Sequence, residues 1–185
     1  MSERSERTMG TALDSALDIT REPFDSPAAQ ALVEALMADL DERYAEDFAD
    51  GDDPDVAAHF TVRAEQVTPP AGVFVVARLD GEPVGCGAVR PVTGGVPRVG
   101  EIKRMYTSPA ARRRGVSRVL LAHLEAEAAV LGYNRLQLET GLRQPEAIAL
   151  YESAGYHRIP SYGQYGGHEL SVCFAKDLEA AAPGS

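Results

Sequence analysis

A basic turn between a strand and a long helix constrains the fold of this chain more than any other stretch. Residues 101–131 read EIKRMYTSPAARRRGVSRVLLAHLEAEAAVL. Residues 101–106 predict a strand, which ends before Pro109 because proline cannot donate to a strand ladder. From Gly115 onward, apolar residues recur at helical spacing, which predicts a helix with one face packed on a sheet. The basic segment 112–117 therefore opens directly onto a helix N-terminus.

This junction has the chemistry of an anion site. The first turn of a helix carries backbone N–H groups without helical partners and a partial positive charge. Gly115 lets a ligand approach the backbone, and the neighbouring arginines add charge and forked donors. Such a turn can hold a pyrophosphate. Taken alone, it is equally compatible with a solvated basic turn, because short glycine motifs are frequent by chance.

The rest of the chain predicts a mixed α/β fold. Further strands are expected at residues 16–21, 73–78, 84–89, 136–140, 156–159 and 169–176, and further helices at 26–44, 54–66 and 145–154. Ser26-Pro27 and Gln144-Pro145 mark helix starts, and Asp80-Gly81 marks a tight hairpin. The order of strand, long helix and strand over residues 101–140 implies a right-handed parallel crossover.

Two motifs together resemble the GNAT superfamily of N-acetyltransferases. Arg112-x-x-Gly115-x-Ser117 follows a strand, where the family has [QR]-x-x-G-x-[GA]. Residues 147–156, AIALYESAGY, are similar to the later family segment, roughly N-x-x-A-x-x-L-Y-x-x-x-G-[FY]. The resemblance covers about residues 73–176. It departs from the family at Ser117, which replaces Gly or Ala, and at Gln144, which stands where Asn is common.

The resemblance implies the GNAT fold, a mostly antiparallel central sheet flanked by helices. The sheet would splay between its fourth and fifth strands and hold acetyl-CoA, the acetyl donor, in the opening. The diphosphate would lie on backbone N–H groups of residues 113–118. The residues expected to bind the cofactor are Met105, Tyr106, Arg112, Arg113, Arg114, Gly115, Val116, Ser117, Arg118 and Gln144.

Two side chains are expected to move protons during acetyl transfer. An amine must lose a proton before it attacks, and the leaving thiolate needs a proton or a hydrogen bond. Glu101 lies where the GNAT members that use a glutamate base have it; a solvent-facing or ion-paired strand residue is the alternative. Tyr151 resembles the tyrosine beside the cofactor sulfur, with a core aromatic as the alternative. Tyr162 and Tyr165, in a glycine-rich loop, are expected near the acceptor, with simple loop packing as the alternative.

Composition limits the class of protein and its partners. A chain of 185 residues fits one domain, expected over residues 13–178, with a disordered tail at 1–12 and a frayed tail at 179–185. No apolar run approaches the roughly 18 residues of a membrane span, and the N-terminus lacks a signal-peptide core. The net charge of −10 disfavours nucleic acid as a partner, because such binding needs a broad basic face.

The cysteine and histidine patterns give no indication of a metal site. Cys86 and Cys173 fall in predicted strands without metal-ligand spacing, which indicates buried thiols in a reducing, cytoplasmic compartment. The histidines also share no ligand spacing; they are His59, His123, His157 and His168. No metal is therefore expected.

The sequence leaves the acceptor open. Acidic residues gather between positions 39 and 55, which favours a cationic acceptor where that segment flanks the pocket; a solvated loop is the alternative. The expected acceptor is a small-molecule or amino-acid-like amine, attacked in a ternary complex. The competing functions are an acyl-CoA-sensing domain without turnover and a protein or peptide N-acetyltransferase. A homodimer, common in the family, is one expected assembly.

Overall fold

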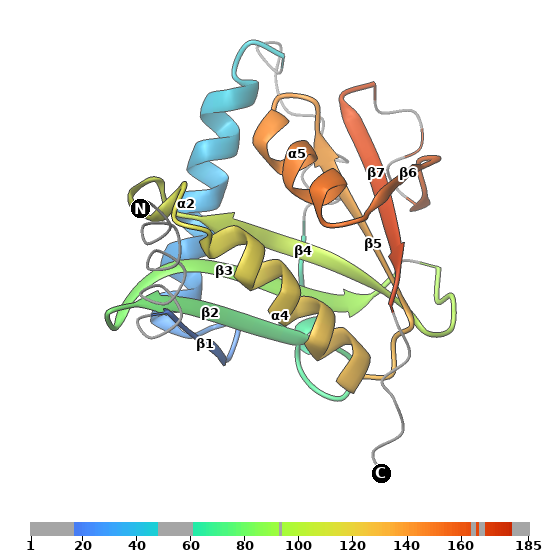
Figure 1. The fold of residues 1–185 in the computed structure, drawn as a ribbon, viewed down its shortest axis with the longest axis horizontal. Coiled ribbons are helices and arrows are strands. Elements are labelled where there is room, and N and C mark those ends of the chain that lie inside the picture. Colours follow the sequence, from blue (N-terminus) through green and yellow to red (C-terminus); the bar gives the residue numbers. More distant parts are fainter. Residues whose placement is uncertain (1–16, 48–60, 93, 164–165, 167–168, 179–185) are drawn as a thin grey trace, which may run out of the picture.

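A computed structural model of the chain describes residues 17–47, 61–92, 94–163, 166 and 169–178 (Figure 1). The strands are β1 (Leu17–Arg21), β2 (Val73–Leu79), β3 (Glu82–Pro91), β4 (Val99–Thr107), β5 (Arg135–Gly141), β6 (His157–Ile159) and β7 (Ser171–Asp177). The helices are α2 (Pro27–Tyr44), α4 (Val116–Val130) and α5 (Pro145–Ser153), with short 3-10 helices η1 (Ala64–Val67) and η2 (Pro109–Ala111).

The strands form one sheet in the order β1-β2-β3-β4-β5-β7-β6. Every neighbouring pair is antiparallel except β4 and β5, which are parallel and are joined through α4. A parallel pair needs a long crossover, and the amphipathic α4 supplies it. The expected mixed α/β fold with a mostly antiparallel sheet is confirmed.

The sheet opens between β4 and β5. Their pairing covers only Val99–Glu101 against Arg135–Gln137, although β4 continues to Thr107 and β5 continues to Gly141. Beyond the paired residues the two strands diverge, so that β1–β4 with α4 form one arm and β5–β7 with α5 form the other (Figure 1). The expected splay between the fourth and fifth strands is therefore present.

A β-bulge lies in β4 beside this opening. Cys86 pairs with Tyr106 and Ala88 pairs with Lys103, so β4 has one residue more than β3 over this stretch. The extra residue bends the strand at Arg104, whose φ is +57°. As a result, Tyr106 packs on the face of the sheet that α2 covers, together with Cys86 and Ala88.

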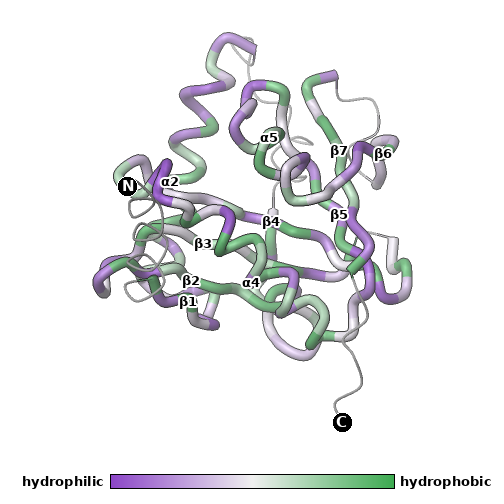
Figure 2. Tube along the Cα trace, viewed as in Figure 1, coloured by the Kyte–Doolittle hydropathy of each residue, from purple (hydrophilic) through white to green (hydrophobic). Residues whose placement is uncertain are grey.

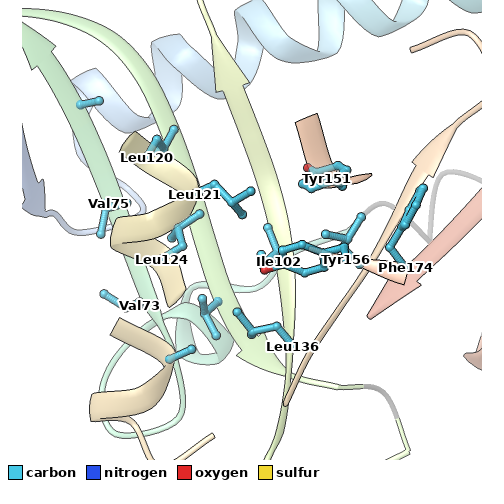
Figure 3. Packing of buried hydrophobic residues seen from close by; sticks show 14 of the residues in the cluster. Val73, Val75, Ile102, Leu120, Leu121, Leu124, Leu136, Tyr151, Tyr156 and Phe174 are labelled. Carbon is cyan, nitrogen blue, oxygen red and sulfur yellow. The ribbon is translucent and has the colours of Figure 1, made fainter. Parts of the chain in front are cut away.

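Two hydrophobic cores hold the helices on opposite faces of the sheet. On one face, α4 buries Leu120, Leu121 and Leu124 against β2 and β4, and Tyr151 and Phe174 continue this core into the other arm (Figure 3). Along α4, hydrophobic and hydrophilic residues alternate, as expected for a helix with one buried face (Figure 2). On the other face, α2 packs its own apolar residues, Ala29, Leu32 and Leu36.

The helix termini follow the chemistry that the sequence indicates. The Ser26 hydroxyl accepts a hydrogen bond from the Ala29 N–H at 3.2 Å, and Pro27 is the first residue of α2. Pro145 has the same place at the start of α5. Asp80 and Gly81 both have positive φ, 52° and 86°, as the tight hairpin between β2 and β3 requires.

One predicted element differs from the structure. A helix is expected over residues 54–66, of which 54–60 lie outside the described residues. The described remainder contains only the 3-10 helix η1, after the extended Arg63. The weak periodicity of this segment did not separate a full helix from one short turn. The expected tails, at 1–12 and 179–185, also lie outside the described residues.

Cys86 and Cys173 are free and buried, as expected. Burial raises the pKa of the Cys86 thiol to about 12. Within the described ranges, no helix has the length and apolar character that a membrane span requires.

Candidate active site

A cavity of about 410 Å³ lies where β4 and β5 diverge. It is bounded by α2, the end of β4, the basic turn before α4, and α5. The lining residues are Leu36, Asp39, Arg43, Met105, Tyr106, Thr107, Arg112, Arg113, Ser117, Gln144, Glu146, Ala147, Leu150 and Tyr151. Its position and size suit part of an extended cofactor wedged between the two arms.

The cavity brings together many of the residues that the sequence singled out. The predicted residues that line it are Met105, Tyr106, Arg112, Arg113, Ser117, Gln144 and Tyr151. The others from the basic turn lie beside it: Arg114 and Gly115 are exposed, and Val116 is buried in the α4 core. The Arg118 guanidinium points to α5, where its Nη2 donates to Ser153 Oγ at 3.4 Å.

The basic turn has the backbone geometry of an anion site. Gly115 is the N-cap of α4 with a φ of +80°, no side chain caps the helix, and its first turn contains no acidic residue. A Cβ placed on Gly115 would meet no atom within 4 Å, so the space beside this backbone is open to a ligand. Arg113 also has a positive φ, 61°, which is a costly conformation for a residue with a side chain. The Arg118 N–H donates to the Gly115 carbonyl at 3.1 Å, which leaves the earlier N–H groups of the turn for an anion.

An ion-pair network crosses the cavity from α2. Asp39 accepts a hydrogen bond from Arg112 Nη2 at 2.9 Å and another from Arg43 Nε at 2.8 Å. Arg43 also pairs with Glu146 at the start of α5. These contacts tie α2 to both sides of the opening. The sequence placed Asp39 in an acidic stretch that could flank the pocket, and it gave Arg43 no role. Leu36, Asp39 and Arg43 recur at helical spacing, which indicates a shared face of the helix but not what that face contacts.

Tyr151 lies between the hydrophobic core and the cavity. Its ring packs near Tyr156 and Phe174, with centroid distances of 5.7 and 6.0 Å (Figure 3). Its hydroxyl donates to Met105 Sδ at 3.7 Å and so points across the opening toward β4. Burial, with a smaller contribution from Glu139, raises the pKa of Tyr151 above its ordinary value. The hydroxyl therefore keeps its proton over the physiological range and is a hydrogen-bond donor at the cavity wall.

Glu101 is fully buried and does not line the cavity. Its Oε2 accepts a hydrogen bond from Arg90 Nε at 2.8 Å, and its Oε1 accepts one from the Tyr162 hydroxyl at 3.0 Å. Arg90 is itself buried and also donates to the Thr61 carbonyl and to Gln66. Of the alternative interpretation, the ion pair is present, whereas a solvent-facing position is wrong because Glu101 is fully buried. The Tyr162 hydroxyl links the segment after β6 to β4.

Lys103 is a second buried charged residue on the face of β4 that carries Glu101. Burial lowers the pKa of its ammonium group, and the nearby Glu101 and Glu139 carboxylates oppose this shift. Glu139, on β5, accepts a hydrogen bond from Ser171 at 2.7 Å. Sequence reasoning did not single out Lys103 or Glu139, since lone charged residues in strands most often face solvent.

The remaining residues that the sequence singled out either do not line the cavity or fall outside the described residues. Tyr165, His59 and His168 fall among residues that the structure does not describe. His123 lies on α4, and its Nε2 is 3.5 Å from Glu127 Oε1. In the described part of the chain, no group of three or more His, Cys, Asp or Glu side chains is placed to hold a metal ion.

A split mixed sheet with a basic turn at the opening is the architecture of a transferase that binds an acyl-CoA, and comparisons with known proteins agree. Residues 30–156 match the model of the Acetyltransferase (GNAT) family. The chain is 37% identical over 154 residues to IAA acetyltransferase from Azospirillum brasilense, covering 83% of this chain and 95% of that one. It is 37% identical over 90 residues to an uncharacterized N-acetyltransferase, YjgM, from Escherichia coli, covering 49% of this chain and 54% of that protein.

Solved structures show the same fold. A Klebsiella pneumoniae protein assigned as an acyl-CoA N-acyltransferase superposes with a TM-score of 0.68 at 32% identity, covering 88% of this chain and 98% of its own. The Salmonella typhimurium protein yncA, solved with its cofactor acetyl-CoA, superposes with a TM-score of 0.57 at 19% identity, covering 92% of this chain and 98% of its own. The chain belongs to the GNAT family and is an N-acetyltransferase that uses acetyl-CoA.

Proposed function

We propose that the chain transfers the acetyl group of acetyl-CoA to a primary amine of a small-molecule or amino-acid-like acceptor. The amine attacks the thioester directly while both substrates are bound. One observation carries this proposal: a single cavity joins the basic turn before α4 to the Tyr151 hydroxyl at the opening between β4 and β5. A cofactor whose diphosphate lies on the turn would extend toward Tyr151 with its thioester end.

The steps require groups that the site offers. The diphosphate would bind the N–H groups of the glycine turn, with Arg112 and Arg113 as counter-charges. The acetyl oxygen would be held by backbone groups at the β4 bulge, at Met105 and Tyr106. Tyr151, which keeps its proton, would donate to the departing thiolate.

Glu101 is proposed as the group that receives the amine proton. Its carboxylate lies where β4 and β5 stop pairing, at the inner end of the opening. Because Arg90 and Tyr162 bind both of its oxygens, a proton would reach it through water or after the Tyr162 hydroxyl gives up its hydrogen bond. The pH dependence of the rate in Glu101→Gln tests whether this carboxylate takes the amine proton.

We propose that the acceptor amine is small and polar and approaches from the side of the sheet that carries Glu101. The buried charged residues Glu101 and Lys103 of β4 and Arg90 of β3 lie on the face of the sheet away from α4, where Glu101 accepts a hydrogen bond from Tyr162. The A. brasilense relative, whose length is almost fully matched, is named as an acetyltransferase of IAA rather than of a protein. The name of this relative favours a small molecule over a protein or peptide acceptor.

A thiol-release assay tests the proposal. Wild-type protein is incubated with acetyl-CoA and a panel of diamines, amino acids and aromatic amines, and CoA release is followed together with the mass of the acetylated product. Acceptor-dependent release is expected with at least one small amine. An acyl-CoA sensor would instead bind acetyl-CoA without release, and a protein acetyltransferase would acetylate peptides and leave the panel unchanged.

A further inference from the structure

Asp39 on α2 contacts two of the three arginines that line the cavity. Its Oδ1 accepts from Arg112 Nη2 at 2.9 Å, and its Oδ2 accepts from Arg43 Nε at 2.8 Å. The third arginine, Arg113, has no hydrogen-bond or ion-pair partner in the part of the chain that the structure describes. Asp39 and Arg112 are 73 positions apart in the sequence, so this contact exists only because the fold places α2 over the basic turn.

The Asp39 carboxylate carries a full negative charge at neutral pH. Burial by itself would raise its pKa, but the hydrogen bonds from Arg112 and Arg43 hold the pKa below its ordinary value. The pair with Arg112 is partly shielded from solvent, with side-chain exposures of 25% for Asp39 and 36% for Arg112. Screening by water is thus incomplete, and a second anion close to Arg112 would be repelled by Asp39.

The Arg112 side chain makes one other hydrogen bond within the described residues, a donation from Nε to the Thr107 carbonyl at 3.3 Å. This contact fixes the base of the guanidinium, while Nη2 faces Asp39. Arg43 is held separately by Glu146, so Asp39 could release Arg112 and keep Arg43. Asp39 would therefore keep its ion pair with Arg43 when an anion binds Arg112.

We propose that Asp39 is an internal counterion of the cofactor site, which the diphosphate of acetyl-CoA or CoA displaces from Arg112. The proposal rests on the placement of the diphosphate at the basic turn in the proposed function. Asp39 lowers the affinity for the cofactor because its charge competes for the same guanidinium. It also speeds release of the CoA product, since the carboxylate is ready to take Arg112 again when the diphosphate leaves.

The test is calorimetry of CoA binding to Asp39→Asn, together with the KM for acetyl-CoA and the rate of CoA dissociation. Asparagine keeps the size of the side chain and one oxygen acceptor but loses the charge. We expect the variant to bind CoA about three- to tenfold more tightly, chiefly through slower dissociation. The difference should shrink as ionic strength rises, because salt screens partly exposed charges.

Asp47→Asn is the matched control. It removes the same charge just after α2, where Asp47 accepts from Arg143 at 2.7 and 2.8 Å and does not line the cavity. Its CoA affinity should equal that of the wild type. An equal gain in both variants would mean that net charge alone tightens binding, and it would overturn the proposal.

A second background tests whether Asp39 acts through Arg112. In an Arg112→Ala protein, Asp39→Asn should give less than half of its gain in affinity, because the contested guanidinium is gone. An undiminished gain, or weaker CoA binding by Asp39→Asn in the wild-type background, would overturn the proposal; the latter would mean that Asp39 positions Arg112 for the cofactor. The acetylation proposal fails separately, when the wild type binds CoA but consumes no amine. Wild-type protein that binds no CoA would refute the cofactor placement and this proposal together.

Discussion

At the scale of single residues, Tyr151 shows how one side chain can serve both packing and chemistry. Its ring belongs to the core with Tyr156 and Phe174, while its hydroxyl reaches Met105 at the cavity. Tyr151→Phe keeps the ring and removes only the hydroxyl. We expect kcat to fall about a hundredfold with little change in KM for acetyl-CoA, since the hydroxyl matters when the thiolate leaves.

Tyr156→Phe is the control for this substitution. Tyr156 is a buried tyrosine in the same cluster, but it does not line the cavity. Steady-state kinetics of both variants with one acceptor show whether the Tyr151 hydroxyl takes part in the reaction. Equal rates for Tyr151→Phe and the wild type would remove the hydroxyl from the mechanism.

A substitution of Glu101 tests catalysis and stability together, because its carboxylate also forms a buried ion pair with Arg90. Glu101→Gln should lower the rate most near neutral pH and recover partly at high pH, where the free amine is more abundant. It should also destabilise the fold by about 3 kcal/mol, because Arg90 is left buried without its counter-charge. Rate–pH profiles and denaturant unfolding measure the two effects separately.

Tyr162→Phe is the companion variant for Glu101. It removes the hydrogen bond to Oε1 at 3.0 Å but keeps the carboxylate and Arg90. A general base at Glu101 predicts a pH-dependent loss in Glu101→Gln alone. If the two variants lose activity in parallel across the pH range, Glu101 holds the loop and does not take the proton.

At the scale of elements, the turn before α4 has a strained backbone conformation at the place proposed to bind CoA. Gly115 has a φ of +80°, a conformation that costs a residue with a side chain roughly 1–2 kcal/mol. Gly115→Val should therefore lower the free energy of unfolding by about that amount. It should also abolish measurable CoA binding, because the side chain would enter the space that the diphosphate needs.

Gly132, at the other end of α4, separates these two effects. Its φ is +89°, and a Cβ there would also meet no atom within 4 Å, but it lies far from the cavity along the helix. Gly132→Val should show a similar loss of stability and normal CoA affinity. Calorimetry on both folded variants tests this; unchanged CoA affinity in Gly115→Val would refute the assignment of the turn.

At the scale of the whole molecule, ion pairs join segments that are distant in sequence. Glu22 pairs with Arg78, and Asp39 and Glu146 belong to the network at the cavity. Burial alone would raise the pKa of each of these carboxyls, yet their arginine partners, and Ser26 for Glu22, hold each pKa below its ordinary value.

These lowered pKa values predict the sign of the pH dependence of stability. A carboxyl whose pKa is lower when folded contributes stability that is complete above its unfolded pKa, about 4.5 for Glu and 3.8 for Asp, and is lost below it. The free energy of unfolding should therefore fall steadily from about pH 5 toward about pH 2. Urea unfolding at several pH values measures it, and constant or rising stability in acid would contradict the ion pairs.

The sequence indicated most of the local structure. Helical spacing indicated α4, Ser26-Pro27 the start of α2, and Asp80-Gly81 the hairpin, because each depends on neighbouring residues. The prediction from sequence was wrong in the described part of residues 54–66, which contains only a 3-10 helix instead of the expected α-helix. The resemblance indicated the splay of the sheet, which the structure confirms. Its assignment of the basic turn to the cofactor stays a prediction.

By itself, then, the sequence determined the elements, the family and the basic turn, which are all encoded within short stretches of the chain. Only the tertiary structure decided which charges meet. Asp39 reaches Arg112 across 73 positions, and Tyr162 reaches Glu101 across 61. No local pattern specifies such pairs, because side-chain contacts between distant segments depend on how helices and strands pack against one another.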